Sequence, residues 1–324
     1  MKRLTYILLL LMIAATAKGQ QLPLYSQYLY NKFLINPAVA GSDGYTSYNL
    51  TARQQWVGYK DAPRTFSFSG QTRILKKKYS IRTSGNKQTF RPPSDGKVGL
   101  GASVFSDKNG LIARTGFQVS YAYHTWVHDQ TQLSFGLAAT GTHYKIDDRA
   151  LDFEDPNEPW LNNEIRNGVF YPDARFGIYL LNPHYSVGFS ADQLFESSAK
   201  IGSSAYHDLR VERHYYLFGS YFFNLGVKDG IEPSFIFSMS ELFEPQMDIG
   251  LTYSHDQSIW GGITYRTTGA IIGLLGFQYS NIFFGYSMDF TLQEIQRITY
   301  GTHELTVAVK FGDNKRKYRW LDRY

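Results

Sequence analysis

The stretch FQVSYAYH, residues 117–124, decides the fold class because two kinds of side chain alternate in it without a break. Apolar or aromatic residues stand at Phe117, Val119, Tyr121 and Tyr123, with Gln118, Ser120, Ala122 and His124 between them. The segment LSFGLA, residues 133–138, repeats the pattern, as do residues 247–253 and 305–311. Alternation with a period of two predicts β-strands that have one apolar face and one small or polar face.

The aromatic content and the scarcity of long apolar runs narrow the fold class further. Aromatic residues make up 16% of the 324-residue chain, including 25 Tyr and 23 Phe, and the mean hydropathy is −0.32. A helical membrane protein needs repeated apolar runs of about 20 residues, which this chain lacks. The sequence fits an all-β transmembrane antiparallel barrel, whose apolar side chains face lipid. A soluble β-sandwich is the alternative.

The N-terminus carries a predicted export signal, residues 1–19. Lys2 and Arg3 precede an apolar run that ends at Ala15, and this run is too short to span a bilayer, which takes about 20 residues. Small residues follow, so we expect cleavage before Gln20. An exported chain of this composition belongs in the outer membrane of a Gram-negative bacterium.

Cysteine and charge exclude several classes of protein. The chain has no Cys, so it has neither disulfides nor the N-terminal Cys of a lipoprotein. Of its 33 basic residues, three lie in the export signal, so 30 remain against 28 acidic ones and the net charge is +2. This near balance gives no indication of a nucleic-acid partner.

The alternating segments predict about fourteen strands within a barrel that spans residues 44–312. We expect them at 44–55, 62–75, 96–107, 111–127, 131–144, 171–181, 184–193, 212–225, 229–241, 244–255, 257–267, 270–280, 281–291 and 302–312. With periplasmic termini, short turns should follow even strands, and the long connections at 145–170, 194–211 and 292–301 should lie outside. The segment Lys76 to Asp95 breaks this rule because it is long and periplasmic.

Two segments rich in Lys and Arg are therefore expected on the periplasmic side: Lys76 to Asp95, and a tail at residues 313–324. The simple interpretation is a solvated loop and a frayed tail. The alternative is a docking surface for periplasmic proteins, with aromatic side chains as anchors. Its candidate contacts are Lys76, Lys77, Lys78, Arg82, Lys315, Arg316, Lys317, Tyr318, Arg319 and Trp320.

The sequence contains no recognisable catalytic motif, and we predict a protein that is not an enzyme and holds no cofactor or metal. His124 and His128 lie about 13 Å apart if they share a strand, too far to share a metal. His214 and Asp248 could both face the lumen, but no nucleophile accompanies them. The acidic loop at residues 147–164 is either solvated or a calcium site, although it lacks an EF-hand pattern.

Two further stretches are LPLYSQYLYNKFLINPAVAG, residues 22–41, and TARQQWVG, residues 51–58. Together they resemble the PorP/SprF family of outer-membrane β-barrels of the Bacteroidetes type IX secretion system. The matching residues are Tyr25, Ser26, Gln27, Tyr28, Asn31, Asn36, Pro37, Ala38, Gly41, Gln55, Trp56 and Gly58.

Residues 20–43 precede the first strand and are too polar to face lipid, so we expect them to fold into the barrel as a plug. The alternative is a periplasmic cap. Tyr25, Tyr28, Asn31 and Asn36 would bond to luminal side chains in the first case. Trp56, at the end of the first strand, suits either an interfacial belt or a luminal anchor.

The resemblance implies a non-enzymatic outer-membrane component of type IX secretion and gliding motility. Some members of the family are linked to periplasmic ring proteins and lipoproteins, and the basic segments favour this role. Others anchor the C-terminal domain of a secreted surface adhesin. A third alternative is an uptake barrel similar to fatty-acid channels, which would need an apolar lumen. The inward positions are instead expected to be mainly Gly, Ser, Thr, Gln and charged residues.

Overall fold

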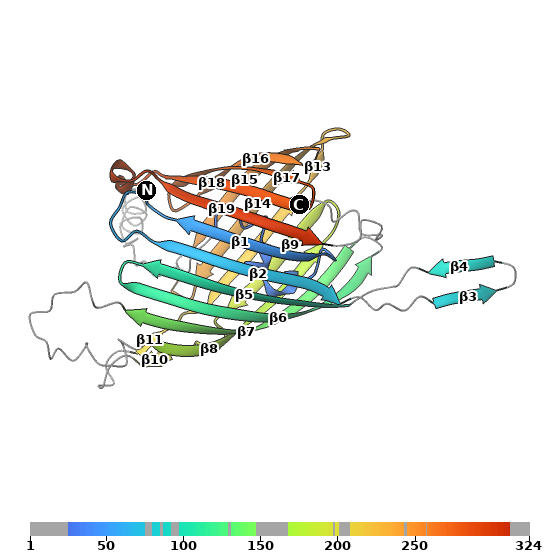
Figure 1. Cartoon of the computed structure of the whole chain (residues 1–324), viewed down its shortest axis with the longest axis horizontal. Coiled ribbons are helices and arrows are strands. Elements are labelled where there is room, and N and C mark those ends of the chain that lie inside the picture. The colour runs from blue at the N-terminus through green and yellow to red at the C-terminus, as the bar shows by residue number, and fades with distance from the viewer. Residues whose placement is uncertain are drawn as a thin grey trace, which may run out of the picture.

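The computed structural model describes residues 25–74, 80–84, 87–91, 97–128, 131–146, 168–196, 198–200, 208–242, 245–256 and 258–311. Within these ranges the chain forms one antiparallel barrel (Figure 1). Its strands are β1 (Thr46–Gln54), β2 (Arg64–Ile74), β5 (Val98–Asn109), β6 (Ile112–His128), β7 (Thr131–Ile146), β8 (Val169–Leu181), β9 (Tyr185–Asp192), β12 (His214–Tyr221) continued by β13 (Phe223–Asn224), β14 (Asp229–Ser240), β15 (Gln246–His255), β16 (Ile259–Arg266), β17 (Ala270–Tyr279), β18 (Ile282–Thr291) and β19 (Thr302–Phe311).

Counting β12 and β13 as one strand, the barrel has the fourteen strands that the alternation predicts, with ends that agree to within a few residues. Two hairpins were not expected. Within the predicted basic loop, β3 (Ser80–Ser84) pairs with β4 (Lys87–Arg91), and β10 (Ser198–Lys200) pairs with β11 (Asp208–Arg210). Three short 3₁₀ turns complete the described part: η1 (Lys32–Leu34), η2 (Pro37–Val39) and η5 (Glu294–Ile298).

The barrel closes where its first strand meets its last. β1 pairs with β19 in a continuous register that sets Leu50 opposite Val307 and Thr51 opposite Thr306. Between these two strands, each barrel strand pairs with the next one along the chain. Closure leaves no unpaired sheet edge, which a hydrocarbon environment requires.

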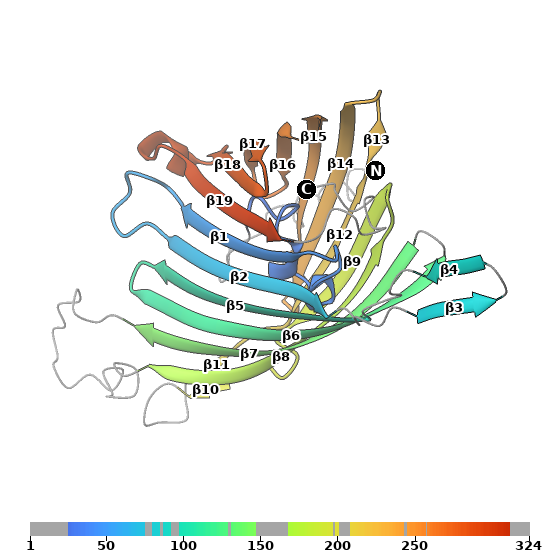
Figure 2. The same cartoon turned by 45° about the vertical axis from the view of Figure 1, so that its right-hand side comes forward.

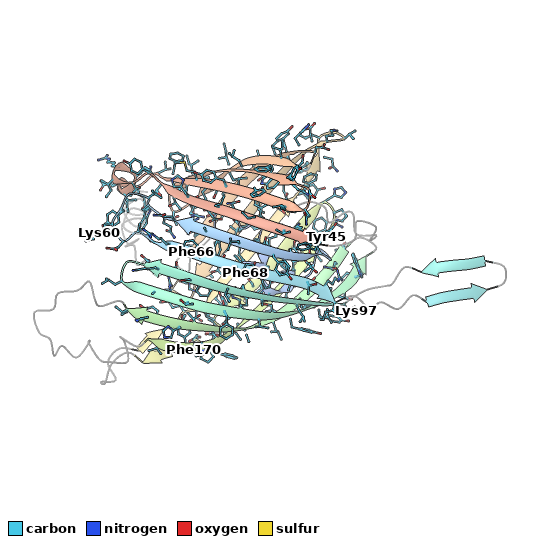
Figure 3. All side chains as sticks on the ribbon, viewed as in Figure 1. Tyr45, Lys60, Phe66, Phe68, Lys97 and Phe170 are labelled. Carbon is cyan, nitrogen blue, oxygen red and sulfur yellow. The ribbon has the colours of Figure 1, made fainter. Side chains whose placement is uncertain are left out.

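The two faces of the wall show that the barrel is built for a membrane. On β1, Ser47, Asn49 and Thr51 are buried toward the lumen, while Tyr48 and Leu50 are 44% and 53% exposed on the outside. Figure 3 shows outer side chains of this kind on β2 and β8. Apolar side chains outside and polar ones inside are the reverse of a soluble protein, so the β-sandwich alternative is wrong.

We call the end at which β1 begins and β19 ends the near end, and the opposite end the far end. Tyr45 and Lys97 lie at the near end and Lys60 at the far end (Figure 3). The connection from β2 to β5 leaves at the near end, as predicted for the basic segment. The longer connections after β7, β9 and β18 leave at the far end, which confirms the predicted parity.

The lumen is less uniformly polar than the sequence predicts. Tyr179, Leu181, Tyr216, Phe218 and Ile236 point inward from β8, β12 and β14 and form an apolar cluster. On β17 the inward residues Ile272 and Leu274 are also buried and apolar. Both faces of these strands carry apolar residues, so alternation alone does not assign their inner face. In the described part of the chain, no helix is long and apolar enough to cross a bilayer.

Candidate functional site: the luminal segment and the far-end pocket

Residues 25–44, here called the luminal segment, lie inside the ring of strands, where the blue ribbon turns back on itself (Figure 2). Tyr28, Phe33 and Ala38 are at most 2% exposed. Buried polar groups need hydrogen-bond partners, and this segment forms few regular backbone hydrogen bonds of its own. Its polar groups must therefore find partners in the barrel wall.

Asn36 and Pro37 fix the turn in the middle of the segment. The Asn36 side-chain oxygen accepts a hydrogen bond from the Ala38 N–H at 2.8 Å, which caps η2, and Pro37 is the first residue of that turn. The Asn36 amide also donates to the carbonyls of Ile178 and Phe189 at 2.9 and 3.0 Å. The side chain is fully buried and bonds to both the turn and the wall.

Glycines in the wall let the segment approach closely. A Cβ on Gly177 would lie 2.0 Å from the Asn36 side-chain oxygen, and a Cβ on Gly99 would lie 1.8 Å from the Ala40 carbonyl oxygen. The close approach of the segment therefore requires glycine at both positions.

Ser26 and Gln27 attach the start of the segment to the last strand. Their backbone N–H groups donate to the two carboxylate oxygens of Glu304 at 2.8 and 2.9 Å. The Ser26 hydroxyl donates to Asp289 at 2.7 Å and accepts a hydrogen bond from Arg53. Arg53 also pairs with Glu304 at 2.9 Å and Asp289 at 3.0 Å. The segment is thus bonded to both strands of the closing seam, β1 and β19.

These contacts belong to a larger set that we call the luminal charge network: Arg53, Arg266, Asp248, Asp289 and Glu304. Arg266 lies 2.8 Å from Asp248 and 3.6 Å from Asp289, so it extends the network to β15 and β16. All five side chains are at most 10% exposed. Three carboxylates and two guanidinium groups are therefore held together away from water, each with at least one ionic partner.

Further contacts show that the luminal segment crosses the lumen from the far end to the near end. Asn31 donates to Ser69 at 3.1 Å, and the Tyr28 hydroxyl lies 3.4 Å from that of Ser234. Nearer the other end, the Gly41 N–H donates to Gln71 at 3.1 Å; Gly41 has a φ of +68°, which favours glycine. Tyr28 and Asn31 thus contact luminal side chains, whereas the Asn36 amide bonds to backbone carbonyls of the wall; a plug that seals the lumen stays a prediction.

The end of the second stretch that resembles the family, residues 51–58, lies outside the lumen. Gln55, Trp56 and Gly58 follow β1 at the far end, where the Trp56 N–H donates to the Thr302 hydroxyl at 3.3 Å. Gly58 has a φ of +95° and packs against the ring of Tyr300. Trp56 and Gly58 thus contact the connection that leads into β19, whereas the Gln55 N–H donates to the Pro63 carbonyl at 2.9 Å. Of the run TARQQWVG, it is Arg53 that meets the luminal segment.

Burial changes the proton affinity of three tyrosines in the luminal segment. It raises the pKa of Tyr25 to about 12, and it also raises the pKa of Tyr28 and of Tyr30 above the ordinary value of a tyrosine. Burial also raises the pKa of Asp43, against the opposing effect of the Lys310 ammonium 3.9 Å away. The neutral form of each tyrosine is the one that fits the lumen.

Several other predicted candidates have separate roles or fall outside the described residues. His214 bonds to Gln193, whereas Asp248 pairs with Arg266, so the two do not form a catalytic pair. Among the residues described, no group of three or more His, Asp or Glu side chains could hold a metal. Outside the described residues lie the export signal, the acidic loop 147–164 and most of the proposed partner contacts: Lys76, Lys77, Lys78, Lys315, Arg316, Lys317, Tyr318, Arg319 and Trp320. Arg82 lies in β3.

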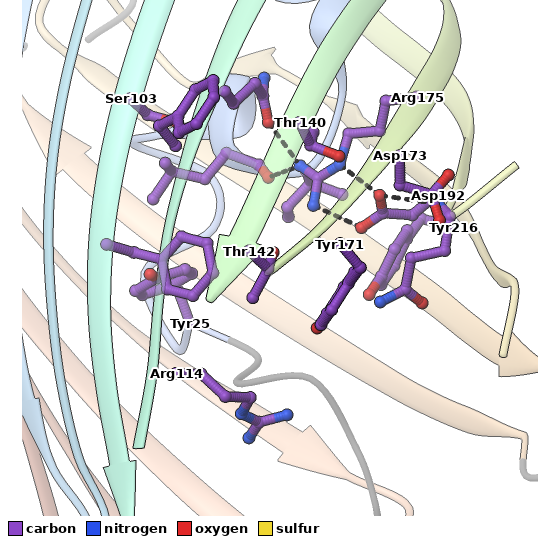
Figure 4. Close-up of a pocket in the computed structure, with 16 residues that line it drawn as sticks. Tyr25, Ser103, Arg114, Thr140, Thr142, Tyr171, Asp173, Arg175, Asp192 and Tyr216 are labelled. Atoms are coloured by element: carbon purple, nitrogen blue, oxygen red, sulfur yellow. Dashed lines mark hydrogen bonds and ion pairs between the residues drawn. The ribbon is translucent and has the colours of Figure 1, made fainter. Parts of the chain in front are cut away.

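A cavity of about 100 Å³, here called the far-end pocket, lies between the luminal segment and strands β5 to β12 (Figure 4). Arg175 lies beside it, paired with Asp192 and donating to the Gln118 side chain at 2.9 Å and to the Leu34 carbonyl. Leu34 and Ile35 of the luminal segment form part of its wall.

A family model described as type IX secretion system membrane protein PorP/SprF matches residues 17–309. The chain belongs to the PorP/SprF family. The match covers the residues of the luminal segment and nearly the whole barrel, and the family is one of secretion-system membrane components rather than of enzymes. The barrel and the family together support a location in the outer membrane.

Solved structures add only a distant likeness to this PorP/SprF protein. The outer membrane protein Omp33 of Acinetobacter baumannii has 9% identity and a TM-score of 0.41, over 83% of this chain and 100% of that one. The toluene transporter TodX of P. putida has 9% identity and a TM-score of 0.43, over 86% and 93%. No curated protein sequence matches the chain. At these TM-scores the likeness says nothing about what this barrel binds or transports.

Sequence reasoning missed the partners of the family motif. Asp248 was expected to face the lumen, but its ion pair with Arg266 was not predicted, and neither was the ion pair of Glu304 with Arg53. A charged residue at an inward position near the end of a strand, such as Asp289 on β18, was the one sequence signal that could have indicated these ion pairs. Alternation assigns the face of a residue but not its distance from residues on other strands.

Proposed function

We propose that this PorP/SprF protein is a non-enzymatic component of type IX secretion that links periplasmic ring or lipoprotein subunits to the outer membrane. The observation that supports this role is the strand topology. The connection from β2 to β5 and the chain beyond β19 both leave the barrel at the near end. The two basic segments of the sequence therefore begin at the same end of the barrel.

In this proposal the near end faces the periplasm. The Lys and Arg residues of both segments steer and hold an acidic partner, and Tyr318 and Trp320 bury their rings in it. Charged side chains set the rate of encounter and the choice of partner, whereas aromatic side chains supply most of the affinity.

The contents of the lumen favour a coupling role over a channel role. The luminal segment crosses the interior and bonds to β1, β2, β8, β9 and β19. A fatty-acid-channel-like protein needs a continuous apolar path, but polar side chains and the luminal charge network interrupt the apolar cluster. We propose that the segment keeps the barrel sealed and rigid.

The test is a pull-down from native outer membrane in mild detergent, read by mass spectrometry. We expect the full chain to recover periplasmic ring proteins or lipoproteins, and a chain without residues 313–324 to lose them. Unchanged heat-modifiable mobility on gels would show that the shortened barrel still folds. Lys60→Gln, at the far end, is the matched charge control and should keep the partners.

Two results would contradict the proposal. Recovery of a single large surface adhesin, unaffected by removal of the tail, would indicate the adhesin-anchoring role. Uptake of hydrophobic ligands by the purified barrel, with no partner recovered, would indicate a channel.

A further inference from the structure

The far-end pocket is lined by polar and aromatic side chains that have no part in the proposed coupling role. Its residues come from β5, β6, β7, β8, β9 and β12 and from the luminal segment. A water molecule needs about 10–15 Å³ of such space, so the pocket has room for roughly seven to ten waters. At about 30 Å³ of liquid volume per water, this corresponds to roughly 200–300 Å³, enough space for one sugar ring.

The charges around the pocket already have partners in the wall, and Asp173 accepts hydrogen bonds from the backbone N–H groups of Ala174 and Phe195. Arg175 forms a two-pronged ion pair with Asp192, and Arg114 pairs with Asp107 at 2.8 Å. A fully paired guanidinium has little affinity left for a ligand carboxylate or phosphate. The pocket is therefore poorly suited to a strongly ionic ligand.

Hydroxyl groups remain for a ligand to bond. The hydroxyls of Ser103, Thr140 and Tyr216 line the pocket, and none of them forms a hydrogen bond with another of the residues that the structure describes. The amides of Gln118 and Gln193 also line the pocket, but each is already bonded to the wall, Gln118 to Ser120 and Arg175 and Gln193 to His214. A ligand that exchanges several neutral hydrogen bonds with such groups is favoured, because each group can donate or accept.

Aromatic rings supply the apolar part of the lining. Tyr25, Tyr171 and Tyr216 stand around the cavity, with the Arg175 and Asp192 pair at one side (Figure 4). A pocket with aromatic walls and a few convergent polar groups is typical of small-molecule sites. A ligand with many hydroxyls and apolar C–H faces uses both kinds of group.

We propose that the far-end pocket binds a neutral sugar ring, either free or as the terminal residue of a glycan. Tyr216, Thr140 and Ser103 bond to its hydroxyls, and the tyrosine rings pack against its C–H faces. The luminal segment completes the site through Leu34 and Ile35. The site is independent of the near-end basic segments, so the coupling role can fail without affecting it.

The experiment uses the full mature barrel in a detergent without a sugar headgroup, because an alkyl glycoside would occupy the pocket. Glucose, galactose, mannose, rhamnose and N-acetylglucosamine are tested by saturation-transfer NMR, and purified lipopolysaccharide is tested as the lipid-linked source. We expect at least one of these probes to bind. Tyr216→Phe and Ser103→Ala should each weaken it about two- to tenfold, the effect of one hydrogen bond.

Matched controls carry the same changes elsewhere in the lumen: Tyr179→Phe and Ser47→Ala, which should bind as the wild type does. Binding of lipopolysaccharide alone, weakened by Tyr216→Phe, would support the site and identify the source as a lipid-linked glycan. Failure of every probe would overturn the proposal. So would equal weakening by the control variants, or binding of short peptides in place of sugars.

Discussion

Arg53 is the residue on which the closing seam and the luminal segment both depend. It bonds to Ser26 of the segment, to Glu304 on β19 and to Asp289 on β18, although its own strand is β1. A guanidinium group suits this position because it offers five N–H donors in a fixed plane. Lysine would offer a single charged point and could not reproduce these bonds.

Replacing Arg53 with Met should destabilise the barrel by about 3–5 kcal/mol, because buried Glu304 loses its ion pair and buried Asp289 keeps only the more distant Arg266. The measurement is the urea midpoint of the detergent-refolded barrel, followed by heat-modifiable mobility. Arg64→Met changes an exposed arginine on β2 and should stay within about 0.5 kcal/mol of the wild type. Equal midpoints for the two variants would show that the network contributes little.

The luminal tyrosines predict a loss of stability at alkaline pH. Their pKa values are raised in the fold, so the folded protein holds their protons more tightly than the unfolded chain does. Stability is then complete below pH 10 and falls as the pH rises from about 10 toward 12, by about 1 kcal/mol per tyrosine and pH unit. The measurement compares urea midpoints at pH 9 and pH 11. Tyr28→Phe should show a smaller drop, and lipid-facing Tyr121→Phe should show the full drop.

At the scale of elements, the luminal segment fits because the wall makes room for it. Gly99 on β5 and Gly177 on β8 face Ala40 and Asn36 at distances that exclude any side chain. The sequence predicted a segment inside the barrel from its polarity and position before the first strand. It did not predict which strands would receive it, because the contacts join residues far apart in the chain.

Gly99→Val should displace the segment, since its first side-chain carbon would overlap the Ala40 carbonyl oxygen. We expect a cost of about 1–3 kcal/mol and a higher conductance in planar bilayers. Gly273→Val is the control, because a Cβ on Gly273 has no neighbour within 4 Å. Wild-type conductance in a folded Gly99→Val barrel would rule out a sealing role for the segment.

The strands were predictable because alternation is strong wherever one face meets lipid. The hairpin of β3 and β4 was missed since its residues alternate weakly, and KKKYSIRTSGNKQTFRPPSD gave only a charge signal. On β8 and β17 the strands were found but the inner face was not, because Tyr179, Leu181, Ile272 and Leu274 are as apolar as their outer neighbours.

At the scale of the whole molecule, the barrel is one sheet whose two ends meet at β1 and β19. The even strand count and the parity of the connections predicted this closure. The seam is also where the family motif, the luminal charge network and the connection braced by Trp56 come together.

The seam can be tested with cysteines, since the chain has none of its own. Thr51→Cys with Thr306→Cys should form a disulfide in the folded barrel, because the two residues are directly opposite and their hydroxyls lie 3.2 Å apart. Non-reducing gels before and after boiling give the measurement. Thr51→Cys with Ala308→Cys is shifted by two residues along the ladder and should cross-link much less. Equal cross-linking would indicate a different register.

The bonds of Ser26 and Gln27 to Glu304 also set an order of events during biogenesis. The bonded residues are 278 and 277 positions apart, so the start of the luminal segment must wait for the last strand of the barrel to be delivered. Contacts of such long separation form late and slowly. A barrel that closed at β1 and β19 before receiving Ser26 would leave the buried Glu304 carboxylate without the two N–H bonds that it accepts from the segment. We therefore expect the segment to be enclosed while the barrel closes, and a chain cut short before residue 302 would lack the strand that holds Ser26 and Gln27.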